Sequence, residues 1–182
     1  MKNRTFYILI SIIAVLGLTI LAILIFAGPR AYLTHQLKLG TTNTFAINNV
    51  KTGMNIRPYN AGISNGTKII QYENNNWECM TWQFIKLEDG SYLLKNLWND
   101  KTFQPSSTPK PGIALFQQPI EANSLQYWEF LKQPDETYLI RLKDTELYVT
   151  VSSDKSNSDI ILMPKQNSAD QQWKLIEQHP TQ

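Results

Sequence analysis

The hydrophobic and polar positions divide the chain into two parts. Residues 6–27 form an apolar run without a charged residue, broken only by Ser11 and Thr19. As a helix this run would span about 33 Å, which is enough to cross the core of a bilayer. After residue 40 no segment has a helical period. Short apolar runs separated by Gly, Pro, Asn and Asp instead predict strands and turns. We therefore expect one N-terminal transmembrane helix, within residues 1–30, followed by an all-β domain.

The charges around the apolar run favour one orientation in the membrane. Lys2 and Arg4 precede it, which favours a cytoplasmic N-terminus and a domain on the far side. Arg30 and Lys38 follow it and reduce this asymmetry. The alternative is a cleaved secretory signal, whose apolar core is usually about 7–15 residues and therefore shorter than this run. Both interpretations place residues 31–182 outside the cytoplasm, either anchored or secreted.

Three similar short sequences recur in the second part of the chain. MTWQF, QYWEF and QQWKL centre on Trp82, Trp128 and Trp173, which are 46 and then 45 residues apart. Three further hydrophobic landmarks keep the same register in each copy: Phe45, Tyr92 and Tyr138; Ile56, Phe103 and Val149; Ile70, Phe116 and Ile161. The chain is therefore divided into a stem at 31–43, three units at 44–88, 89–134 and 135–178, and a tail at 179–182.

Each unit has the pattern of four short strands. In the second unit these are SYLLKNL, KTFQPS, GIALFQQ and QYWEFLK. One such unit cannot bury its apolar face alone, whereas three units around an axis share one core. We expect the three tryptophans to be equivalent core positions on the fourth strands. Cys79 is the only cysteine, so the domain has no intrachain disulfide and must depend on this core.

The Trp-centred repeats resemble the Q-x-W signature of the ricin B-type lectin family, whose fold is a β-trefoil of three four-stranded repeats. The signature is intact before Trp128 (QYW) and Trp173 (QQW), and degenerate before Trp82 (MTW). The resemblance covers residues 44–178. It implies a carbohydrate-binding module with one pocket per repeat. In such a pocket an Asp binds sugar hydroxyls, an aromatic ring stacks on the sugar and an Asn adds a hydrogen bond.

The pocket positions of the family were carried over one at a time. The Asp position holds no carboxylate in any unit and falls at Arg57, Gln104 and Thr150. The stacking position is aromatic only in the first unit and falls at Tyr72, Gln118 and Met163. The Asn position holds asparagine only in the second unit and falls at Trp77, Asn123 and Ser168. No unit has the full set, which argues against the usual galactose-type pocket.

Two units remain as candidates for carbohydrate binding. The second unit offers a set of amide side chains that donate and accept hydrogen bonds: Gln104, Gln117, Gln118, Asn123 and Gln126. We expect this unit to carry the binding, and Gln126 is also a candidate for bonding to backbone in the interior. The first unit is the competitor, because it offers Tyr72, Trp77 and Arg57. Trp98, in the turn NLWND, is a further candidate contact.

Other function classes lack their signatures. Of the 17 Lys and Arg, 14 lie in residues 31–182, where all 15 Asp and Glu also lie, so the domain is near neutral and no nucleic-acid partner is expected. His35 and His179 lie outside the repeats, so we expect no His-based metal or catalytic site, no cofactor and no enzymatic activity. The sequence thus predicts a membrane-anchored, extracytoplasmic module that binds a glycan or glycoprotein. The alternative is a trefoil with decayed sugar pockets that binds a protein, such as a toxin- or receptor-binding subunit.

Overall fold

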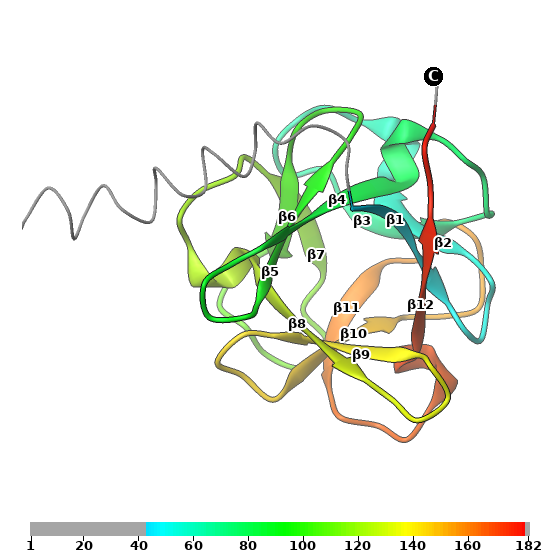
Figure 1. Cartoon of the computed structure of the whole chain (residues 1–182), viewed down its shortest axis with the longest axis vertical. Helices are drawn as coiled ribbons and strands as arrows, with labels where there is room; N and C mark the ends of the chain where they lie inside the picture. The colour runs from blue at the N-terminus through cyan, green and yellow to red at the C-terminus, as the bar shows by residue number, and fades with distance from the viewer. Residues whose placement is uncertain (1–42, 181–182) are drawn as a thin grey trace, which may run out of the picture. The chain divides into compact units, whose positions relative to one another are not determined.

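The computed structural model describes residues 43–180, which form an all-β unit of twelve strands and four single 3-10 turns (Figure 1). The strands of the first unit are β1 (Thr44–Asn49), β2 (Asn55–Pro58), β3 (Ile69–Tyr72) and β4 (Thr81–Lys86). Those of the second are β5 (Tyr92–Asn96), β6 (Thr102–Pro105), β7 (Leu115–Gln118) and β8 (Tyr127–Lys132). Those of the third are β9 (Tyr138–Leu142), β10 (Leu147–Val151), β11 (Ile160–Pro164) and β12 (Trp173–Glu177). The 3-10 turns are η1 (Tyr59–Ala61), η2 (Glu78–Met80), η3 (Ser124–Gln126) and η4 (Ala169–Gln171). The prediction of four strands in each of three units is confirmed.

The first and fourth strands of the units close into a six-stranded antiparallel barrel. Strand β1 pairs with β4 and β12, β5 pairs with β4 and β8, and β9 pairs with β8 and β12. Every barrel strand therefore has two neighbours, and the barrel has no free edge that could pair with another chain. The three units follow one another around a common centre in Figure 1.

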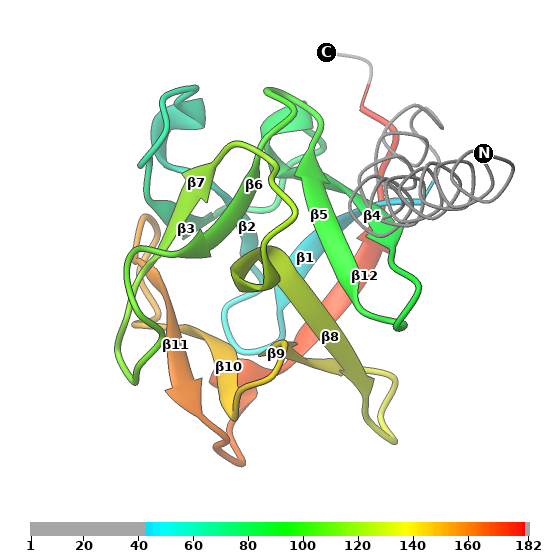
Figure 2. The ribbon, with the colours of Figure 1, turned by 90° about the vertical axis from the view of Figure 1, so that its left-hand side faces the viewer.

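The second and third strands of each unit form hairpins that cap one end of the barrel. They are β2–β3, β6–β7 and β10–β11. Backbone bridges join each hairpin to the next: Lys68 to Phe116, Ala114 to Ile161, and Ile70 to Asp159. Figure 2 shows β3, β7 and β11 of these hairpins on the left and β4, β5 and β12 of the barrel on the right. The cap and the barrel together give the β-trefoil arrangement.

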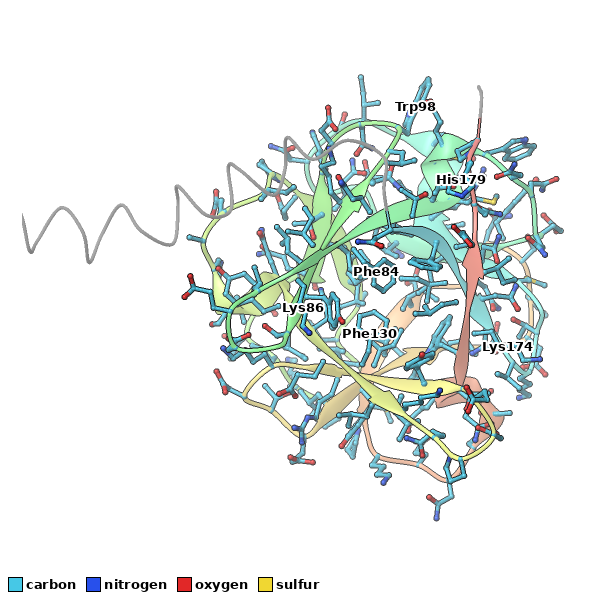
Figure 3. All side chains as sticks on the ribbon, viewed as in Figure 1. Phe84, Lys86, Trp98, Phe130, Lys174 and His179 are labelled. Carbon is cyan, nitrogen blue, oxygen red and sulfur yellow. The ribbon has the colours of Figure 1, made fainter. Side chains whose placement is uncertain are left out.

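The three repeated tryptophans are fully buried and equivalent, as the repeat predicted. On the neighbouring barrel strand, each lies opposite the first aromatic residue of its own unit: Phe45 opposite Trp82, Tyr92 opposite Trp128, and Tyr138 opposite Trp173. Two residues beyond the first two tryptophans, Phe84 and Phe130 point toward the centre of the barrel, with ring centroids 4.9 Å apart (Figure 3). The threefold sequence period is therefore the period of the core.

Both ends of the described chain lie at one end of the barrel. The amide N–H of Gln178 donates to the carbonyl of Thr44 at 3.0 Å, and the Thr44 hydroxyl donates to the carbonyl of Gln178 at 2.5 Å. Within residues 43–180 no helix has the length and hydrophobicity needed to cross a membrane. The transmembrane helix expected at residues 6–27 lies outside the described residues.

Candidate functional site

The hairpin registers place the family's pocket positions at equivalent points of the three units. The Asp position is the same residue of β2, β6 and β10, namely Arg57, Gln104 and Thr150. The stacking position lies near the end of β3, β7 and β11, at Tyr72, Gln118 and Met163. The alignment made from the sequence therefore holds in space. Each set of pocket positions lies on a hairpin and on the loop that precedes the fourth strand of its unit.

In the second unit, the signature glutamine Gln126 joins strand β6 to the loop after β7 through hydrogen bonds. Gln126 is fully buried. Its amide donates to the Gln104 Oε1 atom and to the Pro119 carbonyl, both at 2.8 Å, and its Oε1 accepts from the Glu121 backbone N–H at 2.8 Å. Every polar group of the side chain is thus used within the protein. The expectation that Gln126 contacts a ligand is corrected, while the expectation that it bonds to backbone in the interior is confirmed.

Gln117 is fully buried as well and serves the neighbouring unit. Its amide donates to the carbonyls of Gly62 and Ser64 at 3.1 and 3.0 Å, and its Oε1 accepts from the Asn99 amide at 2.8 Å. The side chain therefore holds the β2–β3 loop of the first unit against the second. Its predicted role as a ligand contact is corrected for the same reason, because it exposes no surface.

The remaining amides of the second unit offer little to a ligand. Gln104, Gln118 and Asn123 are half-buried. The Oε1 atom of Gln104 already accepts from the signature glutamine, and the Oδ1 atom of Asn123 accepts from the Leu125 N–H at 3.0 Å as the N-cap of η3. No aromatic side chain stands at the stacking position. The second unit thus presents isolated amide groups without a ring.

The third unit is tied in the same way. The amide of Gln171 donates to the Thr150 hydroxyl at 2.9 Å and to the Pro164 carbonyl at 3.0 Å. Its Oε1 accepts from the Gln166 N–H at 2.6 Å. The Thr150 hydroxyl in turn donates to the Tyr148 carbonyl at 2.8 Å. The Asp position of this unit is therefore satisfied internally.

The first unit differs because Met80 stands where the other two units have the signature glutamine. Its loop is held by another bond, from the Asn55 amide to the Asn74 Oδ1 atom at 2.9 Å. This arrangement leaves the polar atoms of Arg57, at the Asp position, without the amide partner that Gln104 has. The sequence did not single out Asn55 or Asn74, because their contact joins residues far apart in the chain.

One aromatic ring contacts this arginine, and a second ring lies next to the first. The guanidinium carbon of Arg57 lies 3.8 Å from the ring centroid of Tyr72, a close cation–π contact. The ring centroid of Trp77 lies 6.4 Å from that of Tyr72, with the two planes 30° apart. Trp77 is 44% exposed, while Tyr72 is half-buried. Because Arg57 covers one face of Tyr72, Trp77 offers the larger free aromatic surface to a ligand.

Solved structures with this architecture are numerous. ThreeFoil, a designed threefold-symmetric protein, is 20% identical, with a TM-score of 0.72 over 74% of this chain and 99% of its own. The Rhizoctonia solani agglutinin is 15% identical, with a TM-score of 0.67 over 75% and 95%. The Macrolepiota procera ricin B-like lectin, solved with lactose, is 17% identical, with a TM-score of 0.63 over 76% and 98%. The described domain has the β-trefoil fold of these structures. No family profile and no curated protein matches its sequence.

The electrostatics of this trefoil's first unit centre on the arginine. Burial raises the pKa of the Cys79 thiol, so the thiol is neutral at pH 7 although Arg57 lies beside it. The pKa of Glu73 is lowered, first by its own backbone N–H, then by the hydroxyls of Ser156 and Tyr72, and least by the charge of Arg57, so this exposed carboxylate is ionised at neutral pH. Among residues 43–180 of the trefoil, no group of His, Cys, Asp and Glu is arranged to hold a metal ion.

Proposed function

We propose that the protein is a lectin-like carbohydrate-binding module without catalytic activity, and that it binds its glycan at the first unit. The observation that carries this proposal is the exposed Trp77 beside Tyr72, at the pocket position of a ricin B-type trefoil. A sugar ring has an apolar C–H face that stacks on an aromatic ring, and hydroxyls that pair with amides. Asn74, in the same loop, supplies an amide at this edge of the pocket.

The choice of the first unit revises the expectation from the sequence, which favoured the second. Two of the five amides expected there are buried, and two of the rest, Gln104 and Asn123, each use their oxygen within the protein. A ligand at the second unit would therefore meet only a few neutral amide groups, which form weaker hydrogen bonds than charged groups do. The first unit combines the exposed aromatic surface of Trp77 with the polar side chains of Arg57 and Asn74.

The test uses two tryptophans of similar exposure. Trp77 is 44% exposed and Trp98 is 49% exposed, but Trp98 lies in the turn after β5, as predicted. The full chain in mild detergent is screened on a mixed panel of neutral and acidic glycans, and hits are titrated by calorimetry. Trp77→Ala should weaken binding about tenfold, which corresponds to about 1.4 kcal/mol. Trp98→Ala and Asn123→Ala should leave the affinity unchanged.

Two results would contradict this assignment. Loss of affinity with Asn123→Ala alone would return the site to the second unit. A panel without any hit would remove the support for carbohydrate binding. We further propose that residues 6–27 anchor the module in a membrane with the trefoil outside the cytoplasm, or direct its secretion if they are cleaved.

A protein-binding role is the second candidate, and one surface favours it. Tyr59 and Ile63, in the β2–β3 loop, are exposed and lie in the segment that Trp98 contacts. The Trp98 indole N–H donates to the Ala61 carbonyl at 3.0 Å. Exposed apolar side chains that gather in one place often mark a protein interface. Under this alternative, Trp98→Ala reduces binding of a protein partner while Trp77→Ala does not.

A further inference from the structure

Arg57 carries a buried charge that has no counter-ion in contact with it. The residue is 7% exposed, and its Nε atom is buried without a hydrogen-bond partner. It takes part in none of the ion pairs within 4 Å that residues 43–180 contain. The Tyr72 ring and the neutral Cys79 thiol are its neighbours. A buried guanidinium in this state is unusual, because buried charges are normally paired.

The equivalent positions of the other units show that the fold itself does not require a charge here. Gln104 and Thr150 are neutral, and each is bonded to the signature glutamine of its own unit. The first unit has lost that glutamine to Met80 and gained the arginine. Both departures occur in the unit whose loop before the fourth strand carries the exposed Trp77. The combination leaves the buried Nε donor of Arg57 without an acceptor.

The surrounding charges do not neutralise this donor by contact. Glu73 follows directly after β3 and feels the charge of Arg57, but the two form no ion pair within 4 Å. Glu73 is fully exposed, so solvent screens its interaction with the arginine. No carboxylate of residues 43–180 therefore pairs with Arg57 by contact, and its positive charge is open to an anion from a ligand.

We propose that the first-unit pocket takes an acidic glycan, one that bears a carboxylate or a sulfate group, and that Arg57 receives the anion. This inference rests on the proposed function, carbohydrate binding at the first unit. The planar guanidinium presents its N–H donors in a fork that matches a carboxylate or sulfate. Trp77 provides the stacking surface for the sugar ring that carries the group. The arginine thus stands where the family has an Asp, and its positive charge favours an anionic group over a neutral hydroxyl.

The experiment compares neutral glycans with acidic counterparts that carry a carboxylate or a sulfate. Calorimetry on the full chain in mild detergent would use lactose against sialyllactose, methyl glucoside against methyl glucuronide, and N-acetylgalactosamine against its sulfate. The last pair distinguishes sulfate from carboxylate as the anion. In at least one pair, the acidic member should bind about 10- to 100-fold more tightly, the range expected for a charge-assisted hydrogen bond.

Substitution of the arginine separates this inference from the proposed function. Arg57→Gln, which introduces the residue of the second unit, should remove the preference for the acidic member of each pair. Arg57→Lys should retain part of it. Lys110→Gln is the matched control, because it removes one exposed positive charge from the β6–β7 hairpin turn and should change nothing. Thermal unfolding would verify that each variant is folded.

The outcomes distinguish the two ideas. Equal affinities of the wild-type chain for neutral and acidic members would overturn the charge selection and leave carbohydrate binding intact. This comparison needs no variant, so it decides even if Arg57→Gln fails to fold. A preference that survives in folded Arg57→Gln would show that another group receives the anion. Failure of every glycan to bind would overturn both proposals.

Discussion

The three core tryptophans differ in one hydrogen bond, and this difference predicts their separate contributions to stability. The indole N–H of Trp82 donates to the Ile56 carbonyl at 3.1 Å, and that of Trp173 donates to the Val149 carbonyl at 3.0 Å. The equivalent N–H of Trp128 is buried without a partner. Substitution by phenylalanine removes the N–H in each case while keeping an aromatic ring.

The magnitude follows from counting what each substitution removes. All three tryptophans are fully buried, so the smaller ring costs a similar amount at each, of the order of 2 kcal/mol. At Trp82 and Trp173 the change also breaks a hydrogen bond worth about 1 kcal/mol. At Trp128 it instead removes an unpaired donor whose burial costs about 1–3 kcal/mol. Trp128→Phe should therefore destabilise the domain by about 2–4 kcal/mol less than either of the others.

Equilibrium unfolding in urea, followed by far-UV circular dichroism, is the suitable assay, because fluorescence would change with every tryptophan removed. The comparison requires equal m-values, so that the midpoints report stability alone. Trp98→Phe is the control, since this half-exposed residue should change stability by about 0.5 kcal/mol or less. Equal losses at the three core positions, or a greater loss at Trp128, would refute the hydrogen-bond accounting.

Two further predictions concern acid stability and topology. The Lys143 ammonium, and then the Ser91 hydroxyl, hold the pKa of Asp89 at about 2. Because this folded pKa lies below the ordinary value of 3.8, the stabilisation is present above about pH 4 and is lost as the pH falls toward 2. Asp89→Asn should therefore flatten the acid side of a plot of melting temperature against pH. For topology, an epitope tag placed after Gln182 should be reached by antibody on intact cells or spheroplasts, and a tag reached only after lysis would contradict an extracytoplasmic trefoil.

The fold could be predicted because the core repeats with the chain. A fully buried Trp tolerates little variation, so Trp82, Trp128 and Trp173 kept a visible period of 46 and 45 residues. Apolar and polar residues alternate along the strands between them, and the hairpin registers confirmed the alignment of the three units position by position. Core positions are therefore legible in one sequence, because packing restricts both the type and the spacing of their residues.

The roles of the polar residues were harder to predict. Gln117 and Gln118 are adjacent on β7 and point to opposite faces, since side chains alternate along a strand. One is buried and holds a loop of another unit, while the other is half-buried at the pocket. A clue was present: Gln71 lies 46 residues before Gln117 and is likewise buried, donating to the carbonyls of Ser153 and Lys155. A buried amide that recurs with the core period is a structural residue.

The stacking of Arg57 on Tyr72 could not be read from spacing alone. The two residues are 15 positions apart, and the contact depends on the turn between β2 and β3 as well as on the register of the hairpin. The loss of a Q-x-W glutamine at Met80 was visible, however, and it occurs in the same unit as the arginine. Two departures from a repeat that fall in one pocket are more informative together than either one separately.

In this trefoil the core positions must be equivalent in the three units, whereas the pocket positions need not be. The tryptophans share one core, so a change in any unit affects the whole barrel. Each pocket, in contrast, is built from the hairpin and loop of its own unit, so the pockets can diverge independently.

In the second and third units the signature glutamines, Gln126 and Gln171, hydrogen-bond to the residue at the Asp position of their own unit. In the first unit, where Met80 replaces that glutamine, the Arg57 Nε donor is buried without a partner and the loop carries the exposed Trp77. A single binding pocket gains no avidity within one chain, so tight attachment to a glycan surface would require many copies held together. Anchoring of the N-terminal segment in a membrane would supply that arrangement, and it makes weak binding by one pocket compatible with firm attachment between surfaces.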